Sequence, residues 1–414
     1  MREQSQSHFV GLDVGTSAVR CVIGMLDENS NEDIGKPSII GHGSVPNIGM
    51  RKGVVVHIDD VAEAISQAVN EAERVSGIRV TSATVNVNGS HVVGMNSRGV
   101  IAISGANREI SIDDRMRVEE AAAIVKLPPN REILQIFAKN YRLDGQDNIK
   151  DPVGMQGVRL EVDTHILTAL TPNLRSLDHA LEKAHLHANH HTVSSLAAAE
   201  AVLSRQQKES GTVLLDIGAG TTNLVIIEDG EVQHVAVIPV GGINITNDLA
   251  IGLKTDLDIA EAVKIQQASL STASRYRKGA VTLGKHRYVF DNEEIHMIVE
   301  ARVEELLEYV DKELRKIGRS RKLPGGVVIV GGTAKLPGLD EFAKEKLQLA
   351  ARVGKLEPIK GLIEAVSDSA YATAIGLMLL DMLLLPSGAH YQTKNNRGVI
   401  ETVESVFKLF RRRR

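Results

Sequence analysis

The sequence predicts an α/β protein in which two equivalent β/α halves face each other across a cleft, with a small α+β domain inserted in the first half. Three observations support this fold class. A strand, an Asp-x-Gly turn and a second strand occur at Asp13, and the same pattern recurs at Asp216. Strand-like alternation and helix-like spacing of apolar residues follow one another along both halves. The 414 residues are 43% hydrophobic but only 3% aromatic, which predicts an aliphatic core divided among two or three domains.

Composition excludes several classes of function. The net charge of -4 and the scarcity of aromatic residues argue against nucleic-acid binding. Cys21 is the single cysteine, so neither a disulfide framework nor a Cys-rich zinc site is expected. The polar start lacks the apolar core of a signal peptide, and no apolar run is long enough to span a membrane. The longest run, residues 374–385, contains Asp381 and is expected to form a buried helix, so the chain is expected to be cytoplasmic.

The first half is assigned to residues 1–85 and 163–200. Residues 9–13 and 19–25 are expected to be strands on either side of a turn at 15–17. Apolar residues at three- and four-residue intervals predict a helix over 58–75, and Asp59 and Asp60 suit its N-terminus. Residues 80–87 alternate as a further strand.

Residues 86–162 are predicted to form the inserted small domain. It is expected to contain a pair of short strands at 92–93 and 100–103, a helix over 112–124 and two more strands. Ser111 is expected to cap the helix, and Pro128 and Pro129 to end it.

The second half is assigned to residues 201–242 and 319–386, with a mostly helical subdomain at 243–318 that carries a basic segment at 275–287. Near the end of the first half, His187 and His191 have the spacing of a metal-binding pair on a helix. No nearby carboxylate or cysteine completes a tetrahedral set, so surface histidines are the favoured interpretation.

The C-terminus combines a polar linker, residues 387–400, with an amphipathic segment, residues 401–414. On a helix its apolar residues gather on one side, while basic residues flank them, which is typical of a helix that lies in a membrane interface. A solubility tail and a helix docked on its own core are the alternatives. The residues expected to bind the membrane are Val403, Val406, Phe407, Lys408, Leu409, Phe410, Arg411, Arg412, Arg413 and Arg414.

The two Asp-x-Gly turns have the chemistry of phosphate sites. Glycine lets the backbone N–H groups approach a phosphate, and the neighbouring hydroxyl groups add donors. Asp13 and Asp216 end their strands, where they are expected to hold Mg²⁺ through water. Facing each other, the turns would clamp a triphosphate with Gly15, Thr16, Ser17, Gly218, Gly220, Thr221 and Thr222.

A third glycine turn, Gly331-Gly332-Thr333, follows a buried strand and would let an adenosine approach the backbone. Glu261 and Lys264 are three residues apart on a helix expected over 257–268, so they share a face. Periodicity alone favours a solvated surface pair.

Together these residues resemble the actin/Hsp70/sugar-kinase superfamily, and within it the FtsA family of bacterial cell-division actin homologues. The resemblance covers nearly the whole chain, and the inserted domain and terminal helix are its family-specific features. It rests on GLDVGTSAVRCVIG (11–24), GMRKGVVVHID (49–59), VNVNGSHVVGMNSRGV (85–100), DPVGMQGVRLEV (151–162), LLDIGAGTTNLVI (214–226), IPVGGINITNDLAIGL (238–253), AEAVK (260–264) and VVIVGGTAKLPGL (327–339).

The resemblance implies an actin-like fold that binds ATP and Mg between its halves, with Arg20 beside the phosphates. It also implies head-to-tail self-association into filaments, an anionic membrane surface as partner, and recruitment of later division proteins at the cytoplasmic face of the membrane. The C-terminal tail of the tubulin homologue FtsZ would bind the subdomain at 243–318. The implied adenosine-binding residues are Gly242, Glu261, Lys264, Gly331, Gly332 and Thr333.

Two departures from the pattern bear on the chemistry. The superfamily often has Lys where this chain has Arg20, which keeps the charge but replaces a point charge with a planar fork. This family usually has Glu-Pro where this chain has Ser194-Ser195, so a carboxylate near the expected water-positioning site is missing. ATP binding is therefore expected, with hydrolysis weak or absent and no catalytic residue assigned.

Other interpretations share the clamp. A pilus-assembly-type actin-like ATPase would bind a peptide of a membrane protein, and a small-molecule kinase would need a substrate pocket with a catalytic Asp in the first half. An Hsp70-type chaperone would need a β-rich domain after the linker, and a filament that does not bind membranes would not need the terminal helix.

Overall fold

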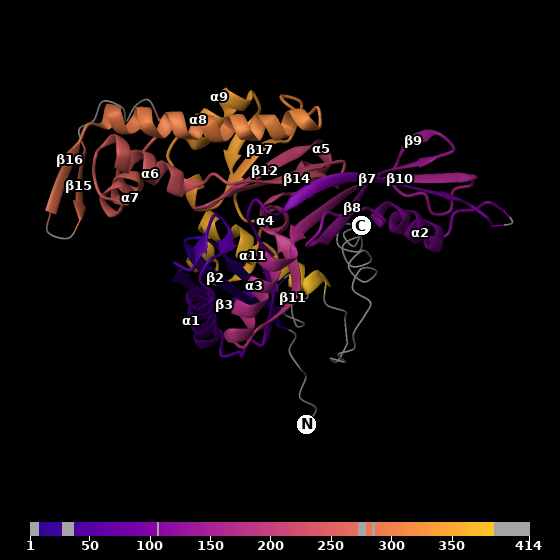
Figure 1. The fold of residues 1–414 in the computed structure, drawn as a ribbon, viewed down its shortest axis with the longest axis horizontal. Coiled ribbons are helices and arrows are strands. Elements are labelled where there is room, and N and C mark those ends of the chain that lie inside the picture. The colour runs from indigo at the N-terminus through magenta and orange to yellow at the C-terminus, as the bar shows by residue number, and fades with distance from the viewer. Residues whose placement is uncertain (1–7, 27–36, 106, 272–278, 284–285, 385–414) are drawn as a thin grey trace.

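The structure is a computed structural model that describes every residue except 1–7, 27–36, 106, 272–278, 284–285 and 385–414. The predicted linker and amphipathic helix therefore lie outside the described residues, as does part of the basic segment at 275–287. Figure 1 shows two stacked bodies, with the inserted domain extending from one end and a helical subdomain at the other.

The first body is built on a six-stranded mixed sheet. Its first three strands form an antiparallel meander, and the next two add parallel to β1. The strands are β1 (His8–Val14), β2 (Ala18–Leu26), β3 (Pro37–Pro46), β6 (Ser82–Val87), β11 (His187–Val193) and β19 (Lys360–Gly361), in the order β11-β6-β1-β2-β3-β19.

The second body repeats this arrangement with five strands. An antiparallel meander is again followed by two strands that add parallel to its first strand. The strands are β12 (Thr212–Ile217), β13 (Thr222–Glu228), β14 (Glu231–Ile238), β17 (Gly326–Val330) and β18 (Ala351–Val353), in the order β14-β13-β12-β17-β18. The shared order and strand directions confirm the predicted duplication of a β/α half.

Helices cover both faces of the first sheet. The helix expected over 58–75 is α1, whose buried stripe includes Val61, Ile65 and Val69 and which ends at the left-handed Gly77. It packs on β2 and β3, whereas α11 lies on the opposite face against β1, and α4 packs on α11. These three helices are α1 (Ile58–Ser76), α4 (Ser194–Val202) and α11 (Ala372–Leu384). The other helices of the two bodies are α3 (Thr171–Lys183), α5 (Arg205–Ser210), α9 (Leu339–Leu347), α10 (Ile363–Val366), η2 (Gly332–Lys335) and η3 (Ser369–Tyr371).

The buried helix α11 packs with the first body, although the sequence grouped residues 319–386 with the second. Asp381 explains this placement, because its buried carboxylate accepts hydrogen bonds from Val10 N at 2.9 Å, Thr84 Oγ1 at 2.8 Å and Asn189 Nδ2 at 2.9 Å. These donors come from β1, β6 and β11 in turn. One acidic residue of α11 therefore ties three neighbouring strands of the first sheet to the helix.

The inserted domain has its own sheet and a small core. The capping of its helix by Ser111 is confirmed, since Asp114 N donates to the Ser111 hydroxyl and the Asp114 carboxylate accepts from Ser111 N. Two details differ from expectation: one continuous strand, β7, replaces the expected pair, and β10 runs on past residue 162. The elements are β7 (Val93–Ala102), α2 (Ile112–Ala123), β8 (Arg131–Leu143), β9 (Gln146–Ile149) and β10 (Arg159–Leu170), with strand order β7-β10-β8-β9.

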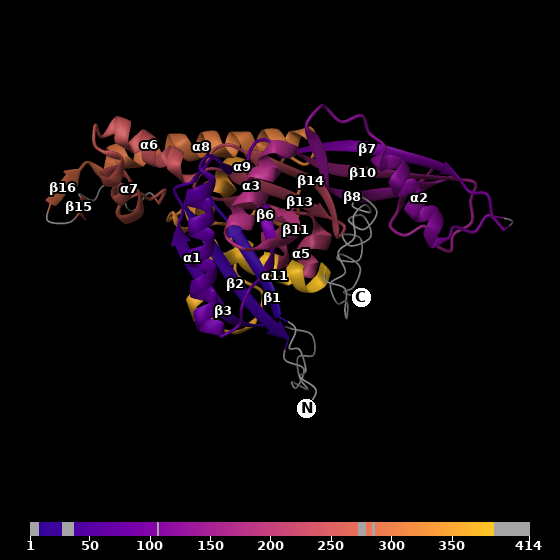
Figure 2. The ribbon, with the colours of Figure 1, turned by 60° about the horizontal axis from the view of Figure 1, so that its bottom comes forward.

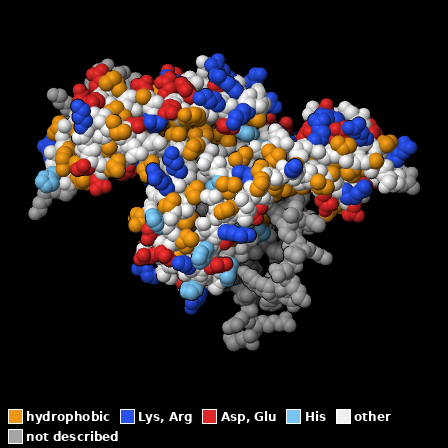
Figure 3. Space-filling view, viewed as in Figure 1, with side chains coloured by type: hydrophobic (Ala, Val, Ile, Leu, Met, Phe, Trp, Pro, Cys, Tyr) orange, Lys and Arg blue, Asp and Glu red, His pale blue; other side chains and the backbone are white. Residues whose placement is uncertain are grey.

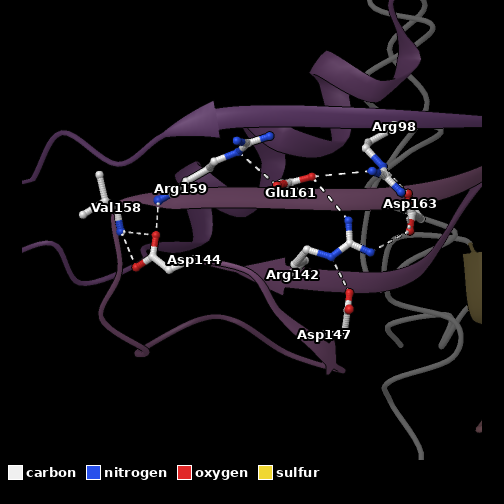
Figure 4. A network of polar contacts seen from close by, with 8 residues as sticks. All are labelled: Arg98, Arg142, Asp144, Asp147, Val158, Arg159, Glu161 and Asp163. Carbon is white, nitrogen blue, oxygen red and sulfur yellow. Dashed lines mark hydrogen bonds and ion pairs between the residues drawn. The ribbon is translucent and has the colours of Figure 1, made fainter.

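An ion-pair network fixes how the strands of the inserted domain lie side by side (Figure 4). Glu161 on β10 lies 3.8 Å from Arg98 on β7, 3.5 Å from Arg142 on β8 and 3.0 Å from Arg159. Asp163 extends the network with a second contact to Arg98 at 2.7 Å. Cross-strand charge pairs of this kind favour one register over its neighbours.

The subdomain at 243–318 is helical only in part. Its long helix α8 runs along the upper side of the second body, and an antiparallel hairpin projects beyond α6 and α7 (Figures 1 and 2). Acidic and basic side chains are interspersed over the face seen in Figure 3. The elements are α6 (Gly242–Gly252), α7 (Leu257–Gln266), β15 (Gly279–Leu283), β16 (His286–Phe290) and α8 (Asn292–Lys316).

The histidine pair does not lie on a helix. His187 and His191 belong to β11, which pairs in parallel with β6, so pairing with the sheet outweighs the helical spacing. His191 Nε2 lies 3.0 Å from Asp178 Oδ1, and His187 is exposed. Among the described residues no helix is both long enough and apolar enough to cross a bilayer.

Candidate functional site

The two bodies enclose a cavity of about 400 Å³ between their equivalent hairpins. Both hairpin turns are closed by the same backbone hydrogen bond, Gly15 N to Ala18 O at 3.1 Å and Gly218 N to Thr221 O at 2.9 Å. The structure brings these predicted residues together in its wall: Asp13, Gly15, Thr16, Ser17, Arg20, Asp216, Gly218, Gly220, Thr221, Gly242, Glu261, Lys264, Gly331, Gly332 and Thr333.

Thr222 is the exception among the described predicted residues. Its side chain is fully buried, and its hydroxyl donates to Val240 O at 2.8 Å. The hydroxyl therefore ties the start of β13 to the segment that follows β14, and Thr222 does not line the cavity, whereas Thr221 does.

Asp13 is a buried carboxylate whose position is set by neighbouring strands. Asn86 Nδ2 on β6 donates to Asp13 Oδ1 at 2.6 Å, and Arg20 Nη1 lies 3.9 Å from Oδ2. Burial raises the pKa of Asp13 to about 7, although Arg20 and Asn86 oppose the rise. A cation that entered the site would favour the ionised form of this carboxyl group.

Asp216 repeats this arrangement in the second body. Thr373 Oγ1, in the first turn of α11, donates to Asp216 Oδ2 at 3.2 Å. Burial raises the pKa of Asp216 to about 6, against the hydrogen bond from Thr373 and the charge of Arg20. Two buried carboxylates among glycine turns and hydroxyls match the few acidic ligands and retained waters that Mg²⁺ prefers beside phosphates.

Another part of the cavity wall contains a polar cluster on α6 and α7. Lys264 Nζ donates to Glu261 Oε2 at 2.6 Å, Thr246 Oγ1 at 2.8 Å and Gly242 O at 3.2 Å. Glu261 and Lys264 are thus a hydrogen-bonded pair in the cavity wall, where 44% of the Glu261 side chain and 18% of the Lys264 side chain are exposed.

The third glycine turn lies between Asp216 and this polar cluster. Gly331 has φ of 90°, and a Cβ there would lie 2.6 Å from Asp216 Oδ1, so only glycine fits. A Cβ on Gly332 would meet nothing within 4 Å, which leaves open space beside the backbone. Thr333 Oγ1 donates to Gly218 O at 3.2 Å and ties this turn to the second hairpin.

Sequence reasoning missed a series of hydrogen bonds, called here the polar chain, that runs from Asp13 through Asn86 and Ser194 to Asn88 in the cavity wall. Ser194 Oγ accepts from Asn86 Nδ2 at 3.0 Å and donates to Asn88 Oδ1 at 2.8 Å. Ser194 and Asn88 line the cavity, as does Asn223, whose buried Oδ1 has no hydrogen-bond partner in the described part of the chain. One signal was available for Asn88 and Ser194, because they follow the carboxyl ends of the parallel strands β6 and β11, where α/β sheets bind ligands.

Acidic groups are few in this cavity. Its described lining contains three carboxylates, of Asp13, Asp216 and Glu261, and Glu261 is engaged by Lys264. Ser194 occupies the wall near Asp13 with a hydroxyl that is already hydrogen-bonded on both sides. The arrangement suits binding of a polyphosphate with its metal better than abstraction of a proton from water.

Comparisons with known proteins agree with this geometry. A model of the family described as cell division protein FtsA matches residues 213–376, and a model described as the SHS2 domain inserted in FtsA matches residues 89–168. The chain is 34% identical to the cell division protein FtsA of Pseudomonas aeruginosa, over 91% of this chain and 89% of the relative. It is 38% identical to FtsA of Bacillus subtilis, over 89% and 82%.

Solved structures share the fold at lower identity. A PilM–PilN type IV pilus biogenesis complex matches with a TM-score of 0.63 at 18% identity, over 91% of this chain and 99% of that one. MreB5 of Spiroplasma citri bound to ADP matches with a TM-score of 0.51 at 14% identity, over 90% and 95%. At these identities the likeness establishes the fold alone, which is actin-like.

Proposed function

Because the chain belongs to the FtsA family of cell division proteins, we propose that it is an ATP-binding filament protein that attaches the division machinery to the cytoplasmic membrane. In this proposal Mg-ATP occupies the cavity, chains associate head to tail, and the terminal amphipathic segment binds the membrane. The subdomain at 243–318 binds the C-terminal tail of FtsZ, and later division proteins join at the division site.

The observation that supports this proposal best is the cavity between the two equivalent hairpins. Asp13 and Asp216 would hold Mg²⁺ through water, and the turns at Gly15 and Gly218 would face the phosphates from opposite sides. The cluster of Glu261 and Lys264 would meet the ribose or base. Bound Mg²⁺ would neutralise phosphate charge, while the chain's own residues orient the nucleotide.

Hydrolysis is proposed to be weak or absent. A general base must reach the attacking water with a free lone pair and a suitable pKa. In this proposal Asp13 serves the metal, and Ser194, in the wall near it, is a hydroxyl rather than a carboxylate. Nucleotide binding itself, rather than the energy of ATP hydrolysis, would then change the arrangement of the two halves.

Membrane attachment rests on the residues of the C-terminus. The apolar side formed by Val403, Val406, Phe407 and Phe410 would enter the interface, and the four terminal arginines would contact anionic headgroups. Each basic residue near an anionic surface contributes about 1 kcal/mol. A short amphipathic helix of this kind gives reversible attachment, as a protein that assembles and disassembles requires.

Co-sedimentation with vesicles of phosphatidylglycerol and phosphatidylethanolamine tests the tether. The full chain with Mg-ATP should pellet with vesicles and bring purified FtsZ with it. A chain truncated after residue 401 should stay in the supernatant, and so should a Phe407→Asp, Phe410→Asp variant that keeps every basic residue. Equal pelleting of the full and truncated chains would contradict the anchor. Pelleting of the full chain without FtsZ would contradict the tether.

A further inference from the structure

A short hairpin outside the two Asp-x-Gly turns reaches the point where those turns meet. Its strands are β4 (Met50–Arg51) and β5 (Val54–Val55), and Lys52 and Gly53 form its tip with φ of 49° and 76°. Both values are left-handed, as the tight turn of a two-residue hairpin requires. The tip is therefore a defined structural element.

Three contacts fix the tip at this point. Gly53 N donates to Thr16 Oγ1 of the first hairpin at 3.0 Å. A Cβ on Gly220 of the second hairpin would lie 3.1 Å from Lys52 Cα and 2.7 Å from Thr16 Oγ1, so only glycine permits this approach. On its other side, a Cβ on Gly53 would lie 2.7 Å from Gly89 N, in the segment between β6 and β7.

The hydrogen bond from Gly53 decides what Thr16 offers a ligand. A hydroxyl has one donor proton and accepts on its lone pairs. Because Thr16 Oγ1 accepts from Gly53, its own proton is free to point at an acceptor in the cavity that it lines. The Gly53 N–H thus orients Thr16 as a donor.

The positive charges in the cavity wall are already balanced. Arg20 faces Asp13 at 3.9 Å, Lys264 lies 2.6 Å from Glu261, and Lys335 pairs with Asp368. Lys52 is exposed, and within the described part of the chain its ammonium has no ion-pair partner. Lys52 is not itself among the described residues that line the cavity, but its long flexible side chain starts beside Gly220, which does line it.

We propose that the Lys52–Gly53 tip is a third phosphate-binding element, in which Gly53 orients the Thr16 hydroxyl and the Lys52 ammonium binds the terminal phosphate of a nucleoside triphosphate. This inference rests on the proposed binding of nucleotide in the cavity and goes beyond it. The tip makes the site selective for a triphosphate over a diphosphate, since only the terminal phosphate reaches Lys52.

Titration calorimetry of the full chain with Mg-ATP and, separately, with Mg-ADP tests this element. Lys52→Met removes the ammonium and keeps the stem, and it should weaken Mg-ATP binding by roughly 10- to 100-fold, as expected for one charge-assisted hydrogen bond. Mg-ADP binding should change less than about threefold. Lys52→Arg should keep most of the ATP preference. Arg51→Met is the matched control, because it removes the same charge one residue away and should leave both affinities within about threefold.

The outcomes separate this inference from the proposed function. If the wild-type chain bound neither nucleotide, both would fail. If it bound both nucleotides but Lys52→Met weakened them equally, or no more than Arg51→Met does, the third phosphate-binding element would be refuted and the proposed nucleotide site would stand. Thermal unfolding of each variant should match wild type, since Lys52 is exposed.

Discussion

Replacing Asn86 tests whether the polar chain behind Asp13 prepares that carboxylate for a metal. In Asn86→Ala, Asp13 Oδ1 loses its donor at 2.6 Å, and Val14 N loses an acceptor at 2.7 Å. Asn86 is buried in β6 and, like Asp13, lies in the first sheet. The substitution removes no ionisable side chain from the cavity.

The expected magnitude follows from the hydrogen bond that is lost. A hydrogen bond to a charged group contributes about 1.5–3 kcal/mol. Since the Asn86 N–H favours the ionised form of Asp13, its removal raises the pKa of Asp13 further and makes the carboxylate less available. The Mg²⁺ concentration that half-saturates ATP binding should therefore rise by roughly 10- to 100-fold.

The assay is a Mg²⁺ titration at fixed ATP, followed by calorimetry at pH 7. Asn88→Ala is the matched control, because Asn88 accepts a hydrogen bond from Ser194 in the same polar chain but makes no contact with Asp13. It should shift the Mg²⁺ midpoint by less than about threefold. Equal shifts in the two variants, or no shift in Asn86→Ala, would refute the idea that Asn86 positions Asp13.

Two further predictions concern stability. Asp381→Ala should destabilise the protein by about 3–5 kcal/mol in denaturant unfolding, since three buried donors lose their acceptor. The control Glu364→Ala, at an exposed site, should change stability by less than about 0.5 kcal/mol. A small effect of Asp381→Ala would show that α11 does not depend on this carboxylate. Burial raises the pKa of Glu119 to about 7. At pH values between the pKa of Glu119 in the unfolded state and this raised value, the folded state binds more protons than the unfolded state. The contribution of Glu119 to stability is therefore present at low pH and is lost as the pH rises through 7. Hydrogen exchange of the inserted domain should therefore quicken from pH 6 to 8 beyond the intrinsic rate, by about 1 kcal/mol of local stability, and Glu119→Gln should remove that slope; a slope that persists would assign it to another group.

The local features of the fold were predictable from sequence. The Asp-x-Gly turns, α1 and the cap at Ser111 depend on residues within a few positions of one another, where periodicity and turn chemistry are decisive. The duplication was visible because both halves repeat the same local pattern around Asp13 and Asp216.

Long-range pairing explains the features that the sequence did not predict. His187 and His191 have helical spacing, but hydrogen bonds to β6 hold them in a strand. The packing of α11 on the first body depends on Asp381, whose hydrogen-bond partners lie far away in the sequence. Asn86 and Ser194 join the site only because β6 and β11 end beside Asp13, which no single stretch of sequence displays.

The central claim, that Mg-ATP binds between the two halves, is tested most directly by calorimetric titration of Mg-ATP into the wild-type chain and Asp216→Asn. The matched control is Asp229→Asn, which makes the same change at an exposed turn outside the cavity. The wild type and the control should bind about one nucleotide per chain with equal affinity, and Asp216→Asn at least about tenfold more weakly. Unchanged affinity in Asp216→Asn, with native thermal unfolding in all three proteins, would contradict the claim.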